Sequence, residues 1–197
     1  MAKMIDKIPS FEGEKIAWES FSANLPQQYV VYNTRSIKGW EFDFCILAEE
    51  VGLFIVEVKG WKPEDIFNVI SEDAIILSGE EEPQSSPRKQ ARGYRFNMVN
   101  LLKQELGMNP LVMDLVCYPL ISKEEYYLKR LDVVSDETET IFKEDLADVT
   151  KLYQKLIGRY NINKSTPHDE FNAKRFALVR HHFEPNYDLK ENVEDLN

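Results

Sequence analysis

The sequence predicts an α/β domain in which a mixed central β-sheet is flanked by helices, with a helical C-terminal extension. Three observations lead to this fold class. The apolar segment 41–59 reads as two strands joined by a tight turn. A second apolar segment, residues 111–118, has the length of a buried strand. Segments 87–106 and 143–157 carry apolar residues at helical spacing on either side of that strand, which is the order of an α/β domain.

A helix and a short strand come before the central segment. Ser10 is a possible N-cap for a helix over about Phe11–Ala23, and Pro26 ends that region. A strand is expected at Tyr29–Asn33 and a turn at Ser36–Gly39. Helix and strand therefore both precede the central pair of strands.

The central segment ends in two ionisable residues. Its first strand covers about Glu41–Leu47, a turn follows at Ala48–Gly52, and the second strand runs over Leu53–Lys59. Side chains alternate along a strand, so one face carries Leu53, Ile55, Glu57 and Lys59 and the other carries Phe54, Val56 and Val58. Charges at the end of a hydrophobic run are costly unless they are paired or bound to a metal.

Short elements and one long helix follow. We expect a loop at 60–63, a short strand or turn at 65–69, a strand at 74–77 and a polar loop at 80–87. Pro87 starts a helix that runs to about Leu106, since proline is favoured at the first helical position. Trp61, in the loop after the second strand, is expected to close the edge of the core, with stacking on a base as the alternative.

The second half of the chain is expected to complete the sheet and its helical cover. Residues 111–118 form a central strand, Tyr126–Val134 alternates enough for an edge strand, and Lys143–Ile157 reads as an amphipathic helix that stops at Gly158. This gives one domain over residues 1–160.

Residues 161–197 are expected to be a helical extension or linker with an acidic tail. Residues 161–167 are linker-like, and a final helix is expected over His168–His182. His181 and His182 are adjacent, and adjacent residues on a helix point in different directions. A surface or interface position is therefore favoured over a metal site for this pair.

Length and charge limit the class of protein. The 197 residues are enough for one domain with a sizeable core. A formal net charge of −10 argues against non-specific nucleic-acid binding over the whole surface, although a metal or a local basic strip can supply a positive field. Cys45 and Cys117 lie in apolar runs and are expected to be buried free thiols. With no signal-peptide pattern and no membrane-spanning run, we expect a cytoplasmic protein.

Two carboxylates and a lysine in the central pair of strands suggest metal-assisted chemistry. Asp43 and Glu57 offer hard oxygen ligands that suit Mg²⁺ or Mn²⁺, and Lys59 can reach the same point. Such a metal lowers the pKa of a bound water and neutralises phosphate charge, while the ammonium positions the water. The alternative is that Glu57 and Lys59 form a solvated pair on an edge strand.

The N-terminal half of the helix 87–106 is the most basic part of this acidic chain. Its cationic side chains are candidates for phosphate contacts, together with Lys62 in the loop after the second strand: Arg88, Lys89, Arg92 and Arg95. Gln90 and Tyr94 share one face of this helix at i and i+4. The alternative is a solvated face that balances the Glu-rich loop before it.

The residues around Asp43 and Glu57-Val58-Lys59 resemble the PD-(D/E)XK nuclease signature. Within that superfamily the chain most resembles the nuclease-related domain, NERD. The resemblance covers about residues 11–120 and rests on Gly13-Glu14, Leu25–Tyr29, Phe42-Asp43-Phe44, Gly52–Trp61 and Gln90–Tyr94. Phe42, instead of proline, precedes Asp43, a departure that the family tolerates.

The resemblance implies a restriction-endonuclease-like core and a role for each matching residue. Asp43, Glu57 and the backbone carbonyl of Val58 would bind the metal, and Lys59 would position or activate water. Glu14 would hold a second metal or a water bound to a metal. Its alternative is an acid in the first turn that suits the helix dipole. Gln90 would orient Lys59 or a phosphate, and Tyr94 would pack beneath it or contact the nucleic acid.

Three hypotheses follow. The first is a Mg²⁺- or Mn²⁺-dependent nuclease that hydrolyses phosphodiester bonds in DNA, with RNA as a further possibility. The second is a non-catalytic DNA-binding or partner-docking module, which could be the N-terminal part of a helicase-associated protein. The third is a scaffold in which residues 57 and 59 form a structural ion pair. The strand type, cleavage polarity, oligomeric state and setting, with phage defence and DNA repair both compatible, stay open.

Overall fold

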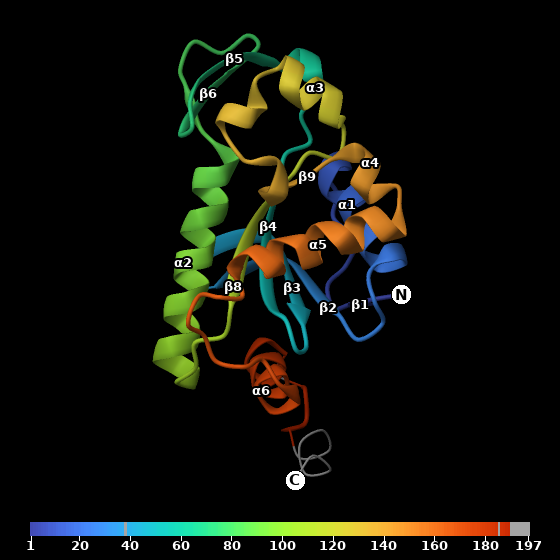
Figure 1. Cartoon of the computed structure of the whole chain (residues 1–197), viewed down its shortest axis with the longest axis vertical. Coiled ribbons are helices and arrows are strands. Elements are labelled where there is room, and N and C mark those ends of the chain that lie inside the picture. Colours follow the sequence, from blue (N-terminus) through green and yellow to red (C-terminus); the bar gives the residue numbers. More distant parts are fainter. Residues whose placement is uncertain (38, 185, 190–197) are drawn as a thin grey trace.

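The central β-sheet of the computed structural model has six strands in the order β1-β2-β3-β4-β8-β9 (Figure 1). The structure describes residues 1–37, 39–184 and 186–189. The strands are β1 (Lys3–Met4), β2 (Val30–Ile37), β3 (Trp40–Ala48), β4 (Gly52–Val58), β8 (Val112–Cys117) and β9 (Thr140–Ile141). Neighbours pair antiparallel from β2 to β4, and parallel at β1–β2, β4–β8 and β8–β9. The predicted α/β class with a mixed central sheet is confirmed.

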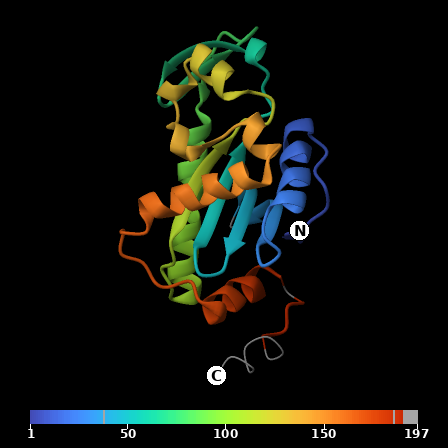
Figure 2. The same ribbon diagram turned by 45° about the vertical axis from the view of Figure 1, so that its right-hand side comes forward.

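Helices cover both faces of this sheet (Figures 1 and 2). On one face, α1 (Glu12–Asn24) and α5 (Val149–Asn163) share an apolar core with Phe54, Val56 and Val58. On the other face, α2 (Pro87–Leu106) and α6 (Ala173–Phe183) share a core with Leu53 and Ile55. The predicted alternation of side chains along β4 is therefore confirmed, and Glu57 belongs by register to the α2 face.

A second, three-stranded sheet lies beyond the ends of β4 and β8, at the upper end of Figure 1. It consists of β5 (Ile66–Ser71), β6 (Ala74–Leu77) and β7 (Gln84–Ser85). Ile66, Val69 and Ile75 from this sheet pack with Tyr118 and Tyr126 in a third apolar cluster. The small sheet is thus attached to the rest of the domain through this third apolar cluster.

The long helix α2 begins and ends at the predicted residues. Pro87 occupies its first turn, and the Ser86 hydroxyl accepts a hydrogen bond from the Lys89 N–H at 3.3 Å. Gly107 ends the helix with a left-handed φ of 61°. Because the stop and start signals are local, the sequence defined this helix well.

The edge strand expected at Tyr126–Val134 is wrong. The segment forms α3 (Lys123–Leu128) and a 3-10 turn at Leu131–Val133. Ser122 and Glu125 make a capping box, in which each side chain accepts a hydrogen bond from the other residue's N–H. This cap starts a helix whose buried Tyr126 packs in the third cluster.

The predicted helix at 143–157 is two helices. α4 (Lys143–Leu146) ends before Asp148, whose side chain accepts hydrogen bonds from the backbone N–H groups of Thr150 and Lys151 and starts α5. α5 continues through Gly158 to Asn163, because a glycine inside a helix weakens it without ending it.

Other boundaries moved by smaller amounts. The final helix, α6, begins at Ala173 and not at His168, because Asn172 caps it. Phe11 and not Ser10 stands at the N-cap of α1. β2 extends to Ile37, through part of the expected turn at 36–39, whose residue 38 is outside the described residues. The expected loop at 80–87 contains β7.

Both cysteines are buried free thiols, as expected. Within the described residues, none of the helices combines the length and the apolar character that crossing a membrane requires. His182 makes an ion pair with Glu105 across 2.9 Å, and a His181 ring nitrogen contacts the Tyr187 carbonyl at 2.8 Å. The two histidines thus have separate partners at the end of α6.

Candidate active site

β3 and β4 stop pairing at the point where the acidic residues lie. Their ladder runs from Ala48–Gly52 to Phe44–Val56. One step farther, Oδ2 of Asp43 accepts a hydrogen bond from the Val58 N–H at 2.7 Å. A carboxylate thus replaces a carbonyl of the neighbouring strand. The N–H and C=O of one strand residue point to the same side, so the Val58 carbonyl also faces Asp43.

Glu57 and Lys59 lie at the same end of β4. Only 3% of Glu57 is exposed, and its Oε1 lies 2.7 Å from Nζ of Lys59. The Lys59 side chain is 21% exposed and so reaches from the buried acid toward solvent. Glu57 and Asp43 are also joined by a hydrogen bond between their side chains. Asp43, Glu57 and Lys59 therefore form one contact group.

The two acids in this group perturb each other. The pKa of Glu57 is raised to about 7, chiefly by burial and then by the negative charge of Asp43, while Lys59 opposes the shift. Burial also raises the pKa of Asp43, opposed by the hydrogen bond from Val58 and by the charge of Lys59. Two carboxyls this close disfavour each other's ionisation, so a cation placed between them would be stabilised.

A crossing of two glycines brings the first turn of α1 to this site. A Cβ atom on Gly13 would lie 2.6 Å from the Gly60 Cα, so this approach requires glycine. Glu14 follows directly; burial raises its pKa, as does the charge of Asp43, while Lys59 lowers it. A cavity of about 400 Å³ opens at the crossing and is lined by Phe11, Glu12, Gly13, Glu14, Val58 and Gly60.

α2 contributes a tyrosine to the site from the other side. Burial raises the pKa of Tyr94, and so do the charges of Glu57 and Asp43, which places its hydroxyl in the field of both acids. The Gln90 amide instead donates to the Ser85 carbonyl at 3.3 Å. The structure thus joins Tyr94 to the acids and places the Gln90 side chain against the segment before α2.

The family model of the nuclease-related domain, NERD, matches residues 9–119, which is more than half of the chain. The chain belongs to the NERD family. The matched range includes α1, the central strands, α2 and β8, and with them every residue of the acidic site. No curated protein matches the chain, and no solved structure does.

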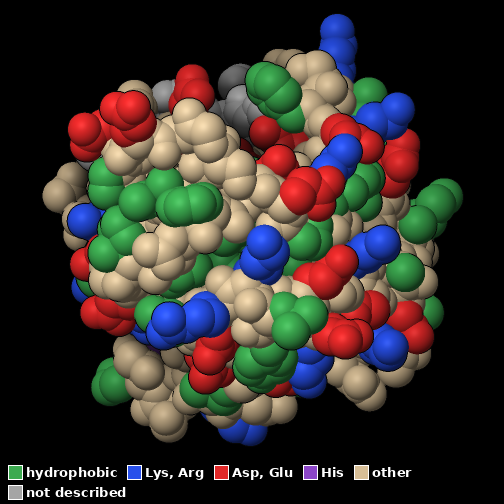
Figure 3. Space-filling view, turned by 90° about the horizontal axis from the view of Figure 1, so that it is seen from above, with side chains coloured by type: hydrophobic (Ala, Val, Ile, Leu, Met, Phe, Trp, Pro, Cys, Tyr) green, Lys and Arg blue, Asp and Glu red, His purple; other side chains and the backbone are tan. Residues whose placement is uncertain are grey.

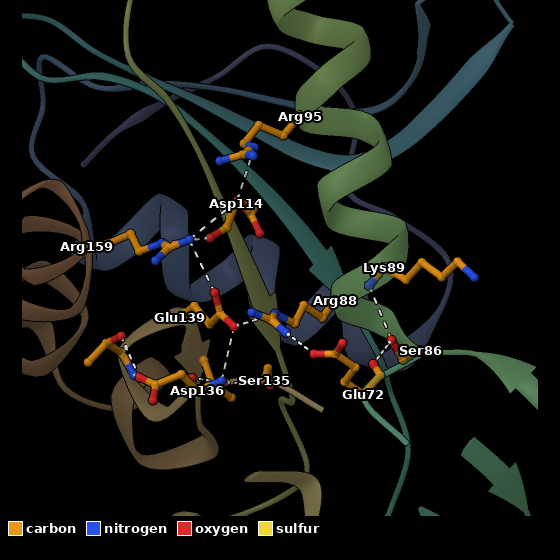
Figure 4. A network of polar contacts seen from close by, with 12 residues as sticks. Glu72, Ser86, Arg88, Lys89, Arg95, Asp114, Ser135, Asp136, Glu139 and Arg159 are labelled. Atoms are coloured by element: carbon orange, nitrogen blue, oxygen red, sulfur yellow. Dashed lines mark hydrogen bonds and ion pairs between the residues drawn. The ribbon is translucent and has the colours of Figure 1, made fainter. Parts of the chain in front are cut away.

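Two of the arginines that were expected to contact phosphate instead make ion pairs inside the NERD domain. Nε of Arg88 lies 2.7 Å from Oε1 of Glu139, and Nε of Arg95 lies 3.4 Å from Oδ1 of Asp114 (Figure 4). Lys62, Lys89 and Arg92 are exposed, and Figure 4 shows the Lys89 side chain extending away from this network. The basic segment therefore divides into internal and outward cations.

Arg159 of α5 joins the two acids of this network, and no pattern in the sequence indicated this role. Its Nη2 lies 3.4 Å from Oδ1 of Asp114 and 3.3 Å from Oε2 of Glu139 (Figure 4). Asp114 stands alone in the apolar run 111–118, and a lone acid in a buried strand is the signal that could have indicated a partner. Only the folded structure identifies Arg159 as that partner.

Proposed function

We propose that this NERD domain is a metal-dependent nuclease of the PD-(D/E)XK type that hydrolyses phosphodiester bonds in DNA. The observation that carries the proposal is the contact group of Asp43, Glu57 and Lys59, placed where β3 and β4 separate. Buried acids that have one lysine among the described side chains are costly for the fold, and ionisable groups perturbed in this way are typical of catalytic sites.

The donor atoms suit a hard divalent cation. Among the described residues, no three His, Cys, Asp or Glu side chains form a complete metal site. Mg²⁺ often takes only one or two carboxylates and keeps several waters, so Asp43, Glu57 and the Val58 carbonyl are an adequate set. The raised pKa of Glu57, to which the charge of Asp43 contributes, supports a cation at this place, because a cation would relieve the repulsion between the two acids. Glu14 would serve a second position.

Each group of the chain then has a defined task. A bound divalent cation would lower the pKa of water and offset charge on the phosphate. The ammonium of Lys59, held 2.7 Å from Glu57, would donate hydrogen bonds to the attacking water or to a phosphate oxygen. Hydrolysis adds one water across one P–O bond, which yields a phosphate end and a hydroxyl end. Tyr94 would pack at the edge of the reacting group.

A purely structural ion pair is the second candidate function for these residues. The same 2.7 Å contact between Glu57 and Lys59 favours it, because a structural pair needs nothing more. A NERD domain of this kind would be a DNA-binding or docking module without catalysis. The two functions differ in what removal of Lys59 does: the first loses cleavage and the second loses stability.

The deciding experiment measures cleavage of labelled single- and double-stranded DNA with Mg²⁺ or Mn²⁺, against EDTA. We expect metal-dependent cleavage that Lys59→Ala lowers by about 100-fold or more, with unchanged circular dichroism and unfolding temperature. Lys103→Ala, an exposed lysine in the last turn of α2, is the control and should cleave normally. A folded wild-type protein that cuts neither DNA with either metal would favour the non-catalytic module.

A further inference from the structure

An exposed aromatic ring stands at the mouth of the cavity beside the acidic site. Phe11 directly precedes α1, is 73% exposed and lines the cavity together with Glu14, Val58 and Gly60. Aromatic rings carry a large apolar surface that is usually buried on folding. Beside a polar site, an exposed ring of this kind offers a flat surface to a ligand.

The glycine crossing fixes this ring near the reactive group. Gly13, two residues after Phe11, touches Gly60, which directly follows Lys59. Trp61 is nearby but occupied: its ring packs against Tyr118 with centroids 6.3 Å apart, and Nζ of Lys59 lies 5.9 Å from its centroid. Among the described side chains at this edge, the ring that is open to solvent is therefore that of Phe11.

The charge distribution argues against binding of a long DNA duplex. Duplex binding depends mainly on many Lys and Arg contacts to phosphates. The chain has a net charge of −10, and Arg88 and Arg95 are held by Glu139 and Asp114. On the face seen from above in Figure 3, Lys and Arg side chains are scattered among Asp and Glu. Stacking of bases on aromatic rings needs less positive charge and is available only to unpaired bases.

We infer that the site takes an unpaired DNA strand and that Phe11 stacks on a base next to the phosphate that a divalent cation would hold at Asp43 and Glu57. This inference rests on the proposed function, because it names the substrate class of the same site. Phe11 is a positioning residue here: its ring orients the strand, and the acids and Lys59 act on the phosphate.

The test is binding of fluorescently labelled oligothymidylate, measured by anisotropy in Mg²⁺ on the Lys59→Ala background, where cleavage does not compete. We expect Phe11→Ala to weaken binding by about 5- to 100-fold, the range for loss of one stacked base. Phe11→Trp should retain binding. Phe67→Ala removes a ring that is 72% exposed on β5, in the other sheet, and should have no effect. Unfolding temperatures should agree among all variants.

Three results would overturn the inference: no measurable binding of the single strand, equal binding by Phe11→Ala, or tighter binding of a matched duplex. These outcomes are separable from failure of the nuclease proposal. Cleavage that is insensitive to substitution of Phe11 would support the nuclease proposal and refute the stacking inference. If binding depends on Phe11 but the wild-type protein never cleaves, the stacking inference is supported and the nuclease proposal is refuted.

Discussion

The molecule contains two groups of buried acids with opposite charge balance. In the network of Figure 4, Asp114 is reached by Arg95 and Arg159, and Glu139 by Arg88 and Arg159. Two buried acids therefore share three arginines, of which Arg88 also pairs with the exposed Glu72. At the end of β4, Lys59 is the one cation among the described side chains that acts on the acids Glu14, Asp43 and Glu57.

The difference separates a structural use of buried charge from a reactive one. An acid whose charge is balanced by cationic partners supports the folded state, and removal of that acid leaves the cations unpaired. Acids that outnumber their cations repel each other; burial raises the pKa of both Asp43 and Glu57, and the charge of Asp43 adds to the shift of Glu57. The first arrangement is complete by itself, whereas the second becomes favourable when a cation binds. The predictions that follow test this contrast, from the largest expected effect to the smallest.

The largest effect should come from Arg159. Arg159→Ala removes one partner from both Asp114 and Glu139, and breaking a buried pair typically costs about 3–5 kcal/mol. Urea denaturation should show this loss in the free energy of unfolding. Arg92→Ala, an exposed arginine of α2, is the control and should change it by less than about 0.5 kcal/mol. A small loss for Arg159→Ala would mean that the network contributes little to the free energy of unfolding.

Glu57→Gln should show the reverse pattern. The acid is as buried as Glu139, but burial and the charge of Asp43 disfavour its ionised form more than Lys59 favours it, so the amide should preserve or increase stability. Cleavage should fall by about 100-fold or more, because a metal-binding oxygen is lost. Glu139→Gln is the matched variant and should lower stability while cleavage per folded molecule is retained. Destabilisation by Glu57→Gln with normal cleavage would make residue 57 structural.

The metal-free protein should lose stability as pH rises from about 5 to about 8. The folded pKa of Glu57 is raised from 4.5 to about 7, so the folded state binds more protons than the unfolded state between these values. Stability is thus fully present below the lower pKa and falls by about 1–3 kcal/mol through the upper one. Asp43 is shifted in the same direction.

Denaturation in EDTA at both ends of this range checks the pH prediction. Glu57→Gln should flatten the dependence, because the titrating group is gone. Added Mg²⁺ should restore stability most at the alkaline end, where the acids are ionised. A wild-type protein that gains stability with pH over this range would contradict the assigned environment of Glu57.

The smallest effect should come from Gln90. Its amide donates to the Ser85 carbonyl, and one such hydrogen bond is worth about 0.5–1.5 kcal/mol. Gln90→Ala should therefore lower cleavage by at most about tenfold. Single-turnover rates would show this against Lys59→Ala. A loss as large as that of Lys59→Ala would mean that Gln90 turns toward the site when DNA is bound.

Local patterns were enough to predict most of the acidic site. Asp43, Glu57 and Lys59 lie on adjacent strands, so alternation and one tight turn bring them together. The place of Glu14 followed only from the family resemblance, because the glycine crossing joins segments 47 residues apart. The contact of Arg159 with Asp114 spans 45 residues and left no local pattern. Tyr126–Val134 was misread because its alternation outweighed the Ser122–Glu125 capping box.

The crossing of Gly13 and Gly60 has a consequence for sequence divergence. The two positions are unequal: a Cβ on Gly60 would lie 3.3 Å from the Gly13 Cα, whereas a Cβ on Gly13 would lie 2.6 Å from the Gly60 Cα. A shift of a few tenths of an ångström would admit alanine at position 60, but alanine at position 13 would push the helix off the strand. Lineages that keep the acidic site can therefore lose the second glycine long before they can lose the first.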